Sequence, residues 1–374
     1  MARFELRAGW MVGDGTEEAR SLDSVIDLLT LVEQESNLSR ACRKLNLSYR
    51  HAWGLLRDAG RSLGGPLLHS VRGQGATLTK LGERLVWANK RVRARLSPVL
   101  ANLASELEAE MRQALPVQTA PIRIHASHSF ALDALRDQLR EQGVASEVRY
   151  CGSEDALTSL SHHTCDLAGF HTPVGPLESV VLDRWRKWLR PRAYVLLHLV
   201  KRRQGIVVAA GNPKRIVGLA DLTRSGIRFV NRQRGSGTRL LLDLLLEQEG
   251  IDWTQIAGFD SAEYTHAAVA AYIASGMGDA GMAVETAAHL FGLTFVPLVE
   301  ERYFLACHRD TLGTVDPIPD VLRSRDFRAR LSLLPGLAAS SCGETMSLLE
   351  AYPQLRDERV HVAPRKRRRA TAAA

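Results

Sequence analysis

The chain has 374 residues, 45% of them hydrophobic, which is enough for two or three domains with ordinary cores. No apolar run reaches the roughly 18 to 20 residues of a membrane span, and the first fifteen residues lack the basic and apolar regions of a secretory signal, so a cytoplasmic protein with no membrane partner is expected. The five cysteines are scattered and form no Cys-x-x-Cys pair, which favours reduced thiols over disulfides or a metal site.

The net charge of +8 is unevenly distributed. Residues 1–115 carry 17 Lys and Arg against 13 Asp and Glu, whereas residues 116–364 carry 27 against 28. The rest of the excess lies in Arg365–Arg369, within a basic tail (residues 361–374) that we expect to be disordered. A basic first domain is consistent with a nucleic-acid partner.

The first domain, residues 1–79, has the pattern of a winged helix-turn-helix. Apolar periodicity predicts helices over Leu22–Glu35, over Asn37–Leu45 and from Ser48 onward, and two short β-runs around a glycine-rich basic tip predict a wing. The start of the third helix is therefore expected in the DNA major groove. An ordinary exposed surface is the alternative interpretation of each predicted contact. The base-edge candidates are Tyr49, Arg50 and His51 after the N-cap Ser48, and the phosphate candidates are Ser39, Arg40, Arg72 and Lys80.

A second helical pattern, over residues 80–116, predicts a linker helix. Its apolar residues follow a spacing of three and four that suits a helix–helix seam for dimerisation. Packing against the chain's own first domain is the alternative. Pro98 is expected to kink this helix because proline lacks a backbone donor.

From residue 117 to residue 360, strand and helix patterns alternate, which predicts a mostly parallel sheet covered by helices. The first lobe is expected at about 121–200 and 301–355, and the second at about 203–300. Ligands of such sheets bind at the carboxyl ends of the strands. Four strand-like runs could cross between the lobes, namely 194–200, 205–210, 293–298 and 302–308.

One loop of the second lobe points most directly to a ligand. Asn231–Arg239 joins an apolar strand to an apolar helix and contains Arg, Gly, Ser and Thr residues. The free N–H groups and the dipole of a helix N-terminus favour an anion, and Gly235 and Gly237 allow its close approach. Ordinary helix capping is the alternative, and the missing Gly-Lys-Ser/Thr ending excludes a nucleotide-triphosphate loop.

Polar residues at other strand ends and helix starts complete the predicted anion site. The twelve histidines include no His-Glu-x-x-His pattern, and Ser236 lacks the Gly-x-Ser-x-Gly context of a nucleophile. We therefore expect neither an enzyme nor a metal site. The predicted ligand-binding residues are Ser127, Ser129, Ser153, His171, Arg232, Arg234, Ser236, Gly237, Thr238 and Tyr264.

Residues 20–90 resemble the winged helix-turn-helix of LysR-type regulators and, more closely, that of molybdate-responsive repressors. The resemblance implies a DNA-binding regulator that dimerises through its linker helix. It is carried by Ala41, Leu45, Leu47-Ser48-Tyr49-Arg50, Ala52-Trp53, Leu63-Gly64-Gly65-Pro66-Leu67 and Leu78-Thr79-Lys80-Leu81-Gly82.

Most of residues 121–340 resemble the type 2 periplasmic-binding-protein fold, in the cytoplasmic form fused behind a helix-turn-helix. The stretches that carry the resemblance are Asn231–Arg239, His266–Ala270 and Gly278–Gly281. The first is also similar to the Ser-Arg-Gly-x-x-Ser-Gly-Thr signature of tungstate-binding proteins, although Arg234 and Gly235 replace two acidic positions.

The predicted fold is thus multidomain, with a mainly α winged helix-turn-helix and an α/β bilobed periplasmic-binding-protein-like domain. The expected function is a transcriptional regulator with double-stranded operator DNA and a small effector anion as partners, no cofactor, and a homodimer or homotetramer as its assembly. The resemblance favours molybdate or tungstate; sulfate, formate or another small carboxylate stay open. Two rival functions are an enzyme or binding module of molybdenum-cofactor chemistry and a ligand-independent architectural DNA binder.

Overall fold

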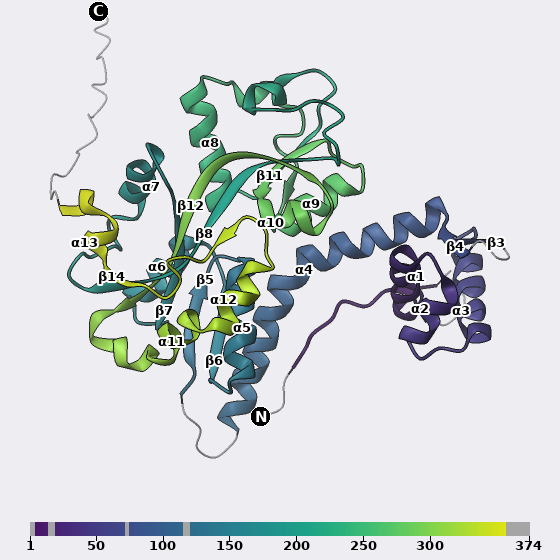
Figure 1. Ribbon diagram of the computed structural model, residues 1–374, viewed down its shortest axis with the longest axis horizontal. Coiled ribbons are helices and arrows are strands. Elements are labelled where there is room, and N and C mark those ends of the chain that lie inside the picture. The colour runs from purple at the N-terminus through teal and green to yellow at the C-terminus, as the bar shows by residue number, and fades with distance from the viewer. Residues whose placement is uncertain (1–3, 14–18, 72–74, 115–119, 357–374) are drawn as a thin grey trace, which may run out of the picture.

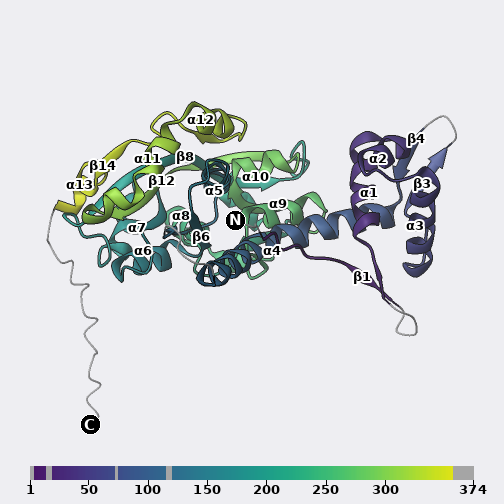
Figure 2. The same cartoon turned by 90° about the horizontal axis from the view of Figure 1, so that it is seen from below.

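The computed structural model describes residues 4–13, 19–71, 75–114 and 120–356. Its N-terminal part contains three helices followed by a β-hairpin, and both views show this group standing apart from the C-terminal domain (Figures 1 and 2). The elements of this part are β1 (Met11–Val12), β2 (Arg20–Ser21), α1 (Asp23–Glu35), α2 (Leu38–Lys44), α3 (Tyr49–Ser62), β3 (Leu68–Val71) and β4 (Gly75–Leu78).

A small apolar core holds α1, α2 and α3 together. Ile26 and Leu29 of α1 belong to it, and Ala41 of α2 has no exposed surface, as expected of a small residue where two helices cross. Between α2 and α3 the chain turns at Asn46, which has a φ of 54°, and Ser48 then caps α3 by accepting a hydrogen bond from the His51 N–H at 3.1 Å. The order of helices and hairpin expected from the sequence is therefore present.

A 34-residue helix, α4 (Lys80–Gln113), connects the two parts of the chain. Its cap is Thr79, whose hydroxyl accepts from the Gly82 N–H at 3.1 Å. The helix contains Pro98 and changes direction between its two halves (Figure 1). Its second half lies on the edge strand of the C-terminal sheet, a contact that neither interpretation of the sequence anticipated, while Val99 and Leu103 stay exposed.

The C-terminal domain is built on one ten-stranded sheet with the order β10-β9-β11-β8-β12-β7-β5-β6, and β13 and β14 pair with β8. Strands β5, β6 and β7 are parallel to one another, as are β9, β10 and β11, so each lobe has its own parallel set. The strands are β5 (Ile122–Ala126), β6 (Ser146–Tyr150), β7 (Leu167–Pro173), β8 (Tyr194–Val208), β9 (Phe229–Arg232), β10 (Ala262–Glu263), β11 (Ala280–Val284), β12 (Thr294–His308), β13 (Leu337–Ala338) and β14 (Thr345–Ser347).

The four crossing runs expected from the sequence are two continuous strands. β8 and β12 each span 15 residues, pair antiparallel with each other, and pass from one lobe to the other. The polar residues that divide the apolar runs, among them Arg202, Gln204 and Glu301, resemble loop residues in the sequence. They are buried and hydrogen-bonded to one another, so the chain remains extended through them.

Helices cover both faces of the sheet in each lobe. Alternate residues of β8 enter different apolar clusters, with Leu197 on the α5 side and Leu196 on the α6 side, as the twofold repeat of a strand requires. In the second lobe, Val207 and Val208 likewise enter different apolar clusters on opposite faces of the sheet. The helices are α5 (Phe130–Glu141), α6 (Ser153–Ser161), α7 (Leu177–Trp185), α8 (Gly237–Glu249), α9 (His266–Ala274), α10 (Glu285–Leu290), α11 (Pro317–Arg323), α12 (Arg325–Ser332) and α13 (Leu348–Ala351).

Within the part of the chain that the structure describes, no helix is both long and apolar enough to cross a membrane. All five cysteine thiols are free. Burial raises the pKa of Cys151 to about 11 and that of Cys165 to about 12, so both remain protonated at neutral pH.

His198 on β8 is expected to make stability depend on pH. It is buried without a hydrogen-bond partner for either ring nitrogen, and burial lowers its pKa to about 4 from 6.5. The unfolded chain therefore binds a proton that the folded chain does not, and stability falls as the pH drops from about 6.5 toward 4. His198→Leu should reduce the loss of unfolding free energy between pH 7 and pH 5 by about 2 kcal/mol.

Urea denaturation at both pH values measures this effect. His162→Leu, at an exposed histidine, is the matched control for loss of an imidazole and should show the wild-type loss of stability between the two pH values. Equal pH dependence of wild type and His198→Leu would contradict the prediction.

Candidate functional site

A cavity of about 600 Å³ lies between the lobes. Its walls come from the loops after β5, β6 and β9, from the segment after β10, and from the middle of α4. Its principal lining residues are Arg95, Leu96, Pro98, Val99, Ser127, His128, Tyr150, Gly152, Ser153, His171, Arg202, Arg232–Thr238 and Tyr264–His266.

Three helix N-termini line this cavity, those of α6, α8 and α9. Ser236 caps α8 by accepting from the Arg239 N–H at 3.1 Å, and Thr265 caps α9 by accepting from the Ala268 N–H at 2.9 Å. Each helix start adds partial positive charge and N–H donors, which together favour a negatively charged ligand. The sequence predicted the termini of α6 and α8 and missed that of α9, whereas the cavity wall after β5 ends at His128, before the predicted terminus of α5.

Arg232, at the end of β9, is the buried cation of the cavity, with 7% of its surface exposed. Its Nη2 donates to the Tyr264 carbonyl at 2.9 Å and its Nε to Gln233 Oε1 at 3.2 Å, but Nη1 is buried and has no partner. Burial, together with the neighbouring Arg202, lowers the pKa of Arg232 to about 9, so the group stays charged at neutral pH. The site therefore offers an unpaired cationic donor to a ligand.

A buried polar cluster lies where the paired strands β8 and β12 pass from one lobe to the other, and its Arg202 lines the cavity. Arg202 Nε and Gln204 Nε2 both donate to Glu301 Oε2 at 2.7 Å. Burial by itself would raise the pKa of Glu301, but the charge of Arg202 and the hydrogen bonds from Arg202 and Gln204 oppose that effect, and the pKa is lowered. The carboxylate is thus ionised and already occupied, and it leaves the charge of Arg232 uncompensated.

His171, at the centre of the cavity wall, is a neutral hydrogen-bonding group. Burial lowers its pKa to about 4. Its Nδ1 lies 3.2 Å from Ser127 Oγ and 3.4 Å from Ser153 Oγ, and its Nε2 has no hydrogen-bond partner. His266 Nδ1 is likewise buried and unpartnered. These imidazoles can supply polar contacts without changing the net charge of the site.

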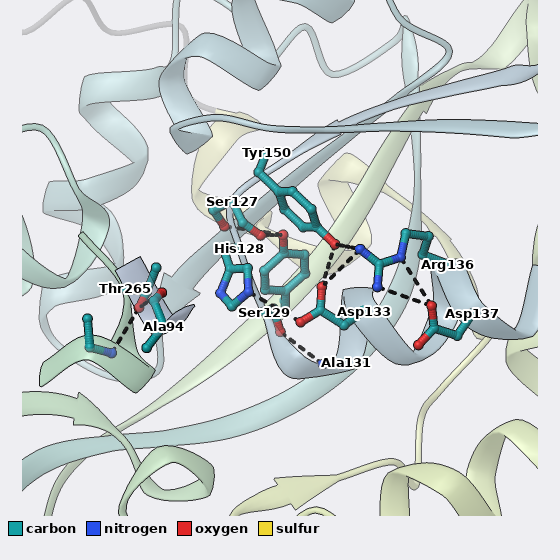
Figure 3. Close-up of polar contacts among 12 residues, drawn as sticks. Ala94, Ser127, His128, Ser129, Ala131, Asp133, Arg136, Asp137, Tyr150 and Thr265 are labelled. Atoms are coloured by element: carbon teal, nitrogen blue, oxygen red, sulfur yellow. Dashed lines mark hydrogen bonds and ion pairs between the residues drawn. The ribbon is translucent and has the colours of Figure 1, made fainter. Parts of the chain in front are cut away.

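A hydrogen-bonded network positions the loops after β5 and β6 (Figure 3). Asp133 accepts from the Tyr150 hydroxyl and lies 3.2 Å from His128 Nε2, while Arg136 Nη1 donates to the Tyr150 oxygen at 3.1 Å. Burial opposes ionisation of Asp133, but His128, Tyr150 and Arg136 outweigh it and lower the pKa of Asp133. Two cavity walls are therefore joined by charge-assisted hydrogen bonds.

The structure brings nine of the ten predicted ligand-binding residues to the cavity. Ser129 is the exception, because its hydroxyl accepts from the Ala131 N–H at 3.3 Å in an ordinary helix cap (Figure 3). Arg234 lies at the rim with its side chain 84% exposed, and Tyr264 is also exposed. The nine are Ser127, Ser153, His171, Arg232, Arg234, Ser236, Gly237, Thr238 and Tyr264.

Sequence reasoning missed the ionic residues around the cavity, namely the buried Arg202, Glu263 and Glu301 and the partly exposed Arg95. A charged residue within an apolar run, as at Arg202 and Glu301, was the one sequence signal that could have indicated them. Within the described residues, no group of three or more His, Cys, Asp or Glu side chains could hold a metal ion.

The predicted DNA contacts lie on the N-terminal helices. Tyr49, Arg50 and His51 are exposed on the first turn of α3, and Ser48 is exposed although its hydroxyl caps the helix. The phosphate candidates Ser39, Arg40 and Lys80 are exposed, and Arg72 lies outside the described residues.

Each lobe has its own parallel strands, and the cavity lies between the two lobes. This arrangement is typical of two-lobed binding proteins. Residues 136–322, half of the chain, match the PBP-like family, described as a PBP superfamily domain, and the chain belongs to that family.

A relative from Bacillus subtilis (strain 168), named uncharacterized protein YvgK, is 29% identical over 244 residues, which cover 65% of this chain and 79% of that protein. Two solved structures are more distantly similar. A Corynebacterium glutamicum OxyR C206 mutant has 15% identity and a TM-score of 0.41, covering 85% of this chain and 96% of its own. A putative phosphate ABC transporter substrate-binding protein with bound phosphate from Clostridium perfringens has 12% identity and a TM-score of 0.42, covering 58% and 98%.

Gly237 is expected to tolerate no side chain. A Cβ there would lie 2.5 Å from His171 Nε2, and that ring is buried between the two serines. Gly237→Ala should lower the unfolding free energy by about 1–3 kcal/mol, because overpacking forces the ring to move. Gly218→Ala is the control, since a Cβ at Gly218 meets no atom within 4 Å. Chemical denaturation gives both values, and equal stability of the two variants would refute the close approach.

Proposed function

We propose that this chain is a DNA-binding transcriptional regulator of the cytoplasm, without catalytic activity, whose C-terminal domain binds a small anion and thereby alters operator binding. The observation that carries the proposal is Nη1 of Arg232, a buried cationic donor without a protein partner in a cavity lined by three helix N-termini. An unsatisfied buried donor costs about 1–3 kcal/mol, or more when charged, and a bound anion removes that cost.

For the effector we propose a fully ionised oxyanion, molybdate or tungstate first, on the resemblance of the Asn231–Arg239 loop. Sulfate, formate and other small carboxylates offer the same acceptor chemistry and belong in the same test. We propose a homodimer or homotetramer as the assembly, supported by the exposed Val99 and Leu103 on α4. No cofactor is required.

For DNA recognition, the support is the exposed first turn of α3, where Arg50 can pair with a guanine edge. Regulation follows if the anion binds one arrangement of the two domains more tightly than the other, because a ligand shifts an equilibrium only through such a difference.

Anion binding is tested by thermal and chemical denaturation with molybdate, tungstate, sulfate and formate. An effector at 100 times its dissociation constant should stabilise the wild type by about 2.7 kcal/mol. Arg232→Gln should abolish that stabilisation while DNA binding is retained, because it removes the unpaired charge. The control is Arg228→Gln, at an arginine of the same segment that is paired with Asp279 outside the cavity and should leave the response intact. A wild type that none of the four anions stabilises would overturn the proposed site and favour an architectural DNA binder.

Operator recognition is tested after selecting a duplex from a random-sequence library with the wild-type protein. Arg50→Ala should weaken binding to that duplex by about 1–3 kcal/mol in fluorescence anisotropy, because a base-edge contact is lost. Arg57→Ala removes a cation from a later turn of α3 and should cost less than about 0.5 kcal/mol. A protein that selects no duplex, or an Arg50→Ala variant that binds as wild type, would contradict this assignment.

A further inference from the structure

The middle of α4 makes side-chain contacts with both lobes on either side of the cavity. On the side of the second lobe, Thr265 Oγ1 donates to the Ala94 carbonyl at 2.8 Å, as Figure 3 shows, and Arg91 contacts the sulfur of Met277. On the side of the first lobe, Asn102 exchanges hydrogen bonds of 3.0 and 2.7 Å with the main chain of Tyr150. The helix therefore bridges the cleft that an anion would occupy.

The strongest of these contacts is an ion pair between Arg95 and Glu263. Arg95 donates through Nε and Nη2 to the two carboxylate oxygens, with Nε 2.5 Å from Oε2. The Glu263 side chain is 1% exposed and the Arg95 side chain 42% exposed, so the arginine reaches a buried carboxylate from the cavity edge. Two-point pairs of this kind are strong and geometrically specific.

Glu263 is also the acidic neighbour of Arg232. The two residues are in register on the parallel strands β10 and β9, so their side chains extend from the same face of the sheet. A buried carboxylate with no other partner would compensate the charge of Arg232 and compete with an anionic ligand. Because Arg95 already pairs with the Glu263 carboxylate, the charge of Arg232 remains available to pair with a ligand.

We propose that Arg95 is a positioning residue of the anion site. By neutralising Glu263, it keeps the charge of Arg232 uncompensated, so that anion binding and docking of α4 on the cleft stabilise each other. This inference rests on the proposed function. Because α4 begins at Lys80, directly after the β3–β4 hairpin, the same contact links occupancy of the cavity to the placement of the N-terminal helices. By linkage, whatever docks α4 also tightens anion binding by the same factor.

A double-mutant cycle of Arg95→Gln and Glu263→Gln tests the role of Arg95. Molybdate, tungstate, sulfate and formate are the probes in isothermal titration calorimetry of the full chain. Arg95→Gln should weaken binding and raise the dissociation constant on the order of tenfold, within the range usual for coupled sites. The double variant Arg95→Gln/Glu263→Gln should return to within about threefold of wild type, because the competing carboxylate is gone.

If Arg95 only touched the anion, the double variant would bind as weakly as Arg95→Gln, and the inference would be overturned. Arg95→Lys keeps the charge and should lie between wild type and Arg95→Gln, which preserves the test if the glutamine variant folds poorly. Arg84→Gln, at an exposed position of α4, is the control and should bind as wild type. A wild type that binds none of the four probes would overturn the proposed function and this inference together, whereas failed rescue with normal wild-type binding overturns the inference alone.

Amide hydrogen exchange supplies a readout that a merely structural role would not change. The bound anion should slow exchange over residues 91–105 in the wild type, and at equal site occupancy it should do so less in Arg95→Gln and in the double variant, because both lack the ion pair that couples α4 to the site. An anion that binds without slowing exchange in this segment of the wild type would refute the coupling.

Discussion

The ion pair between Arg202 and Glu301 is the constraint that the two-lobed architecture depends on. Both side chains are at most 2% exposed, and they are in register where β8 and β12 pass from one lobe to the other. Removing one partner of a buried pair leaves an uncompensated charge, which costs about 3–5 kcal/mol. Sliding one strand past the other would separate the two charges, so the pair fixes the register of the strands at this point.

The same pair determines which charge is left for a ligand. Three arginines, Arg95, Arg202 and Arg232, surround two buried carboxylates, Glu263 and Glu301. Two of the arginines each take one carboxylate, and the third has an unpaired nitrogen. The positive charge that the cavity offers is thus a property of the whole charge set rather than of any one residue, with the helix N-termini adding partial charge of the same sign.

The elements that depend on local sequence were predictable. Apolar periodicity and capping residues located the N-terminal helices, the alternation of strands and helices, and the loop that ends in Ser236, because these signals act within a few residues. The two long strands could not be predicted. A charged residue such as Arg202 indicates the end of an apolar strand unless its buried partner is known. Arg95 and Glu263 are 168 positions apart, so no local pattern could join them. Ser129 and Ser127 are equivalent in the sequence, and only the fold separates the helix cap from the cavity wall.

The contacts of α4 have a consequence for how such a protein can be rearranged. A helix that only separates two domains can be shortened, or exchanged together with either of them. Here residues 91–105 contribute a cavity wall, an ion pair and the edge-strand contacts of the C-terminal domain, although they lie within the helix that begins directly after the N-terminal helices and hairpin. The C-terminal domain, together with the residues that complete its cavity, therefore begins inside α4, ahead of residue 91. A hybrid that joined a foreign N-terminal part at the end of α4 would carry a C-terminal domain whose cavity lacks the α4 wall, whereas a junction in the first turns of α4 would keep the cavity whole.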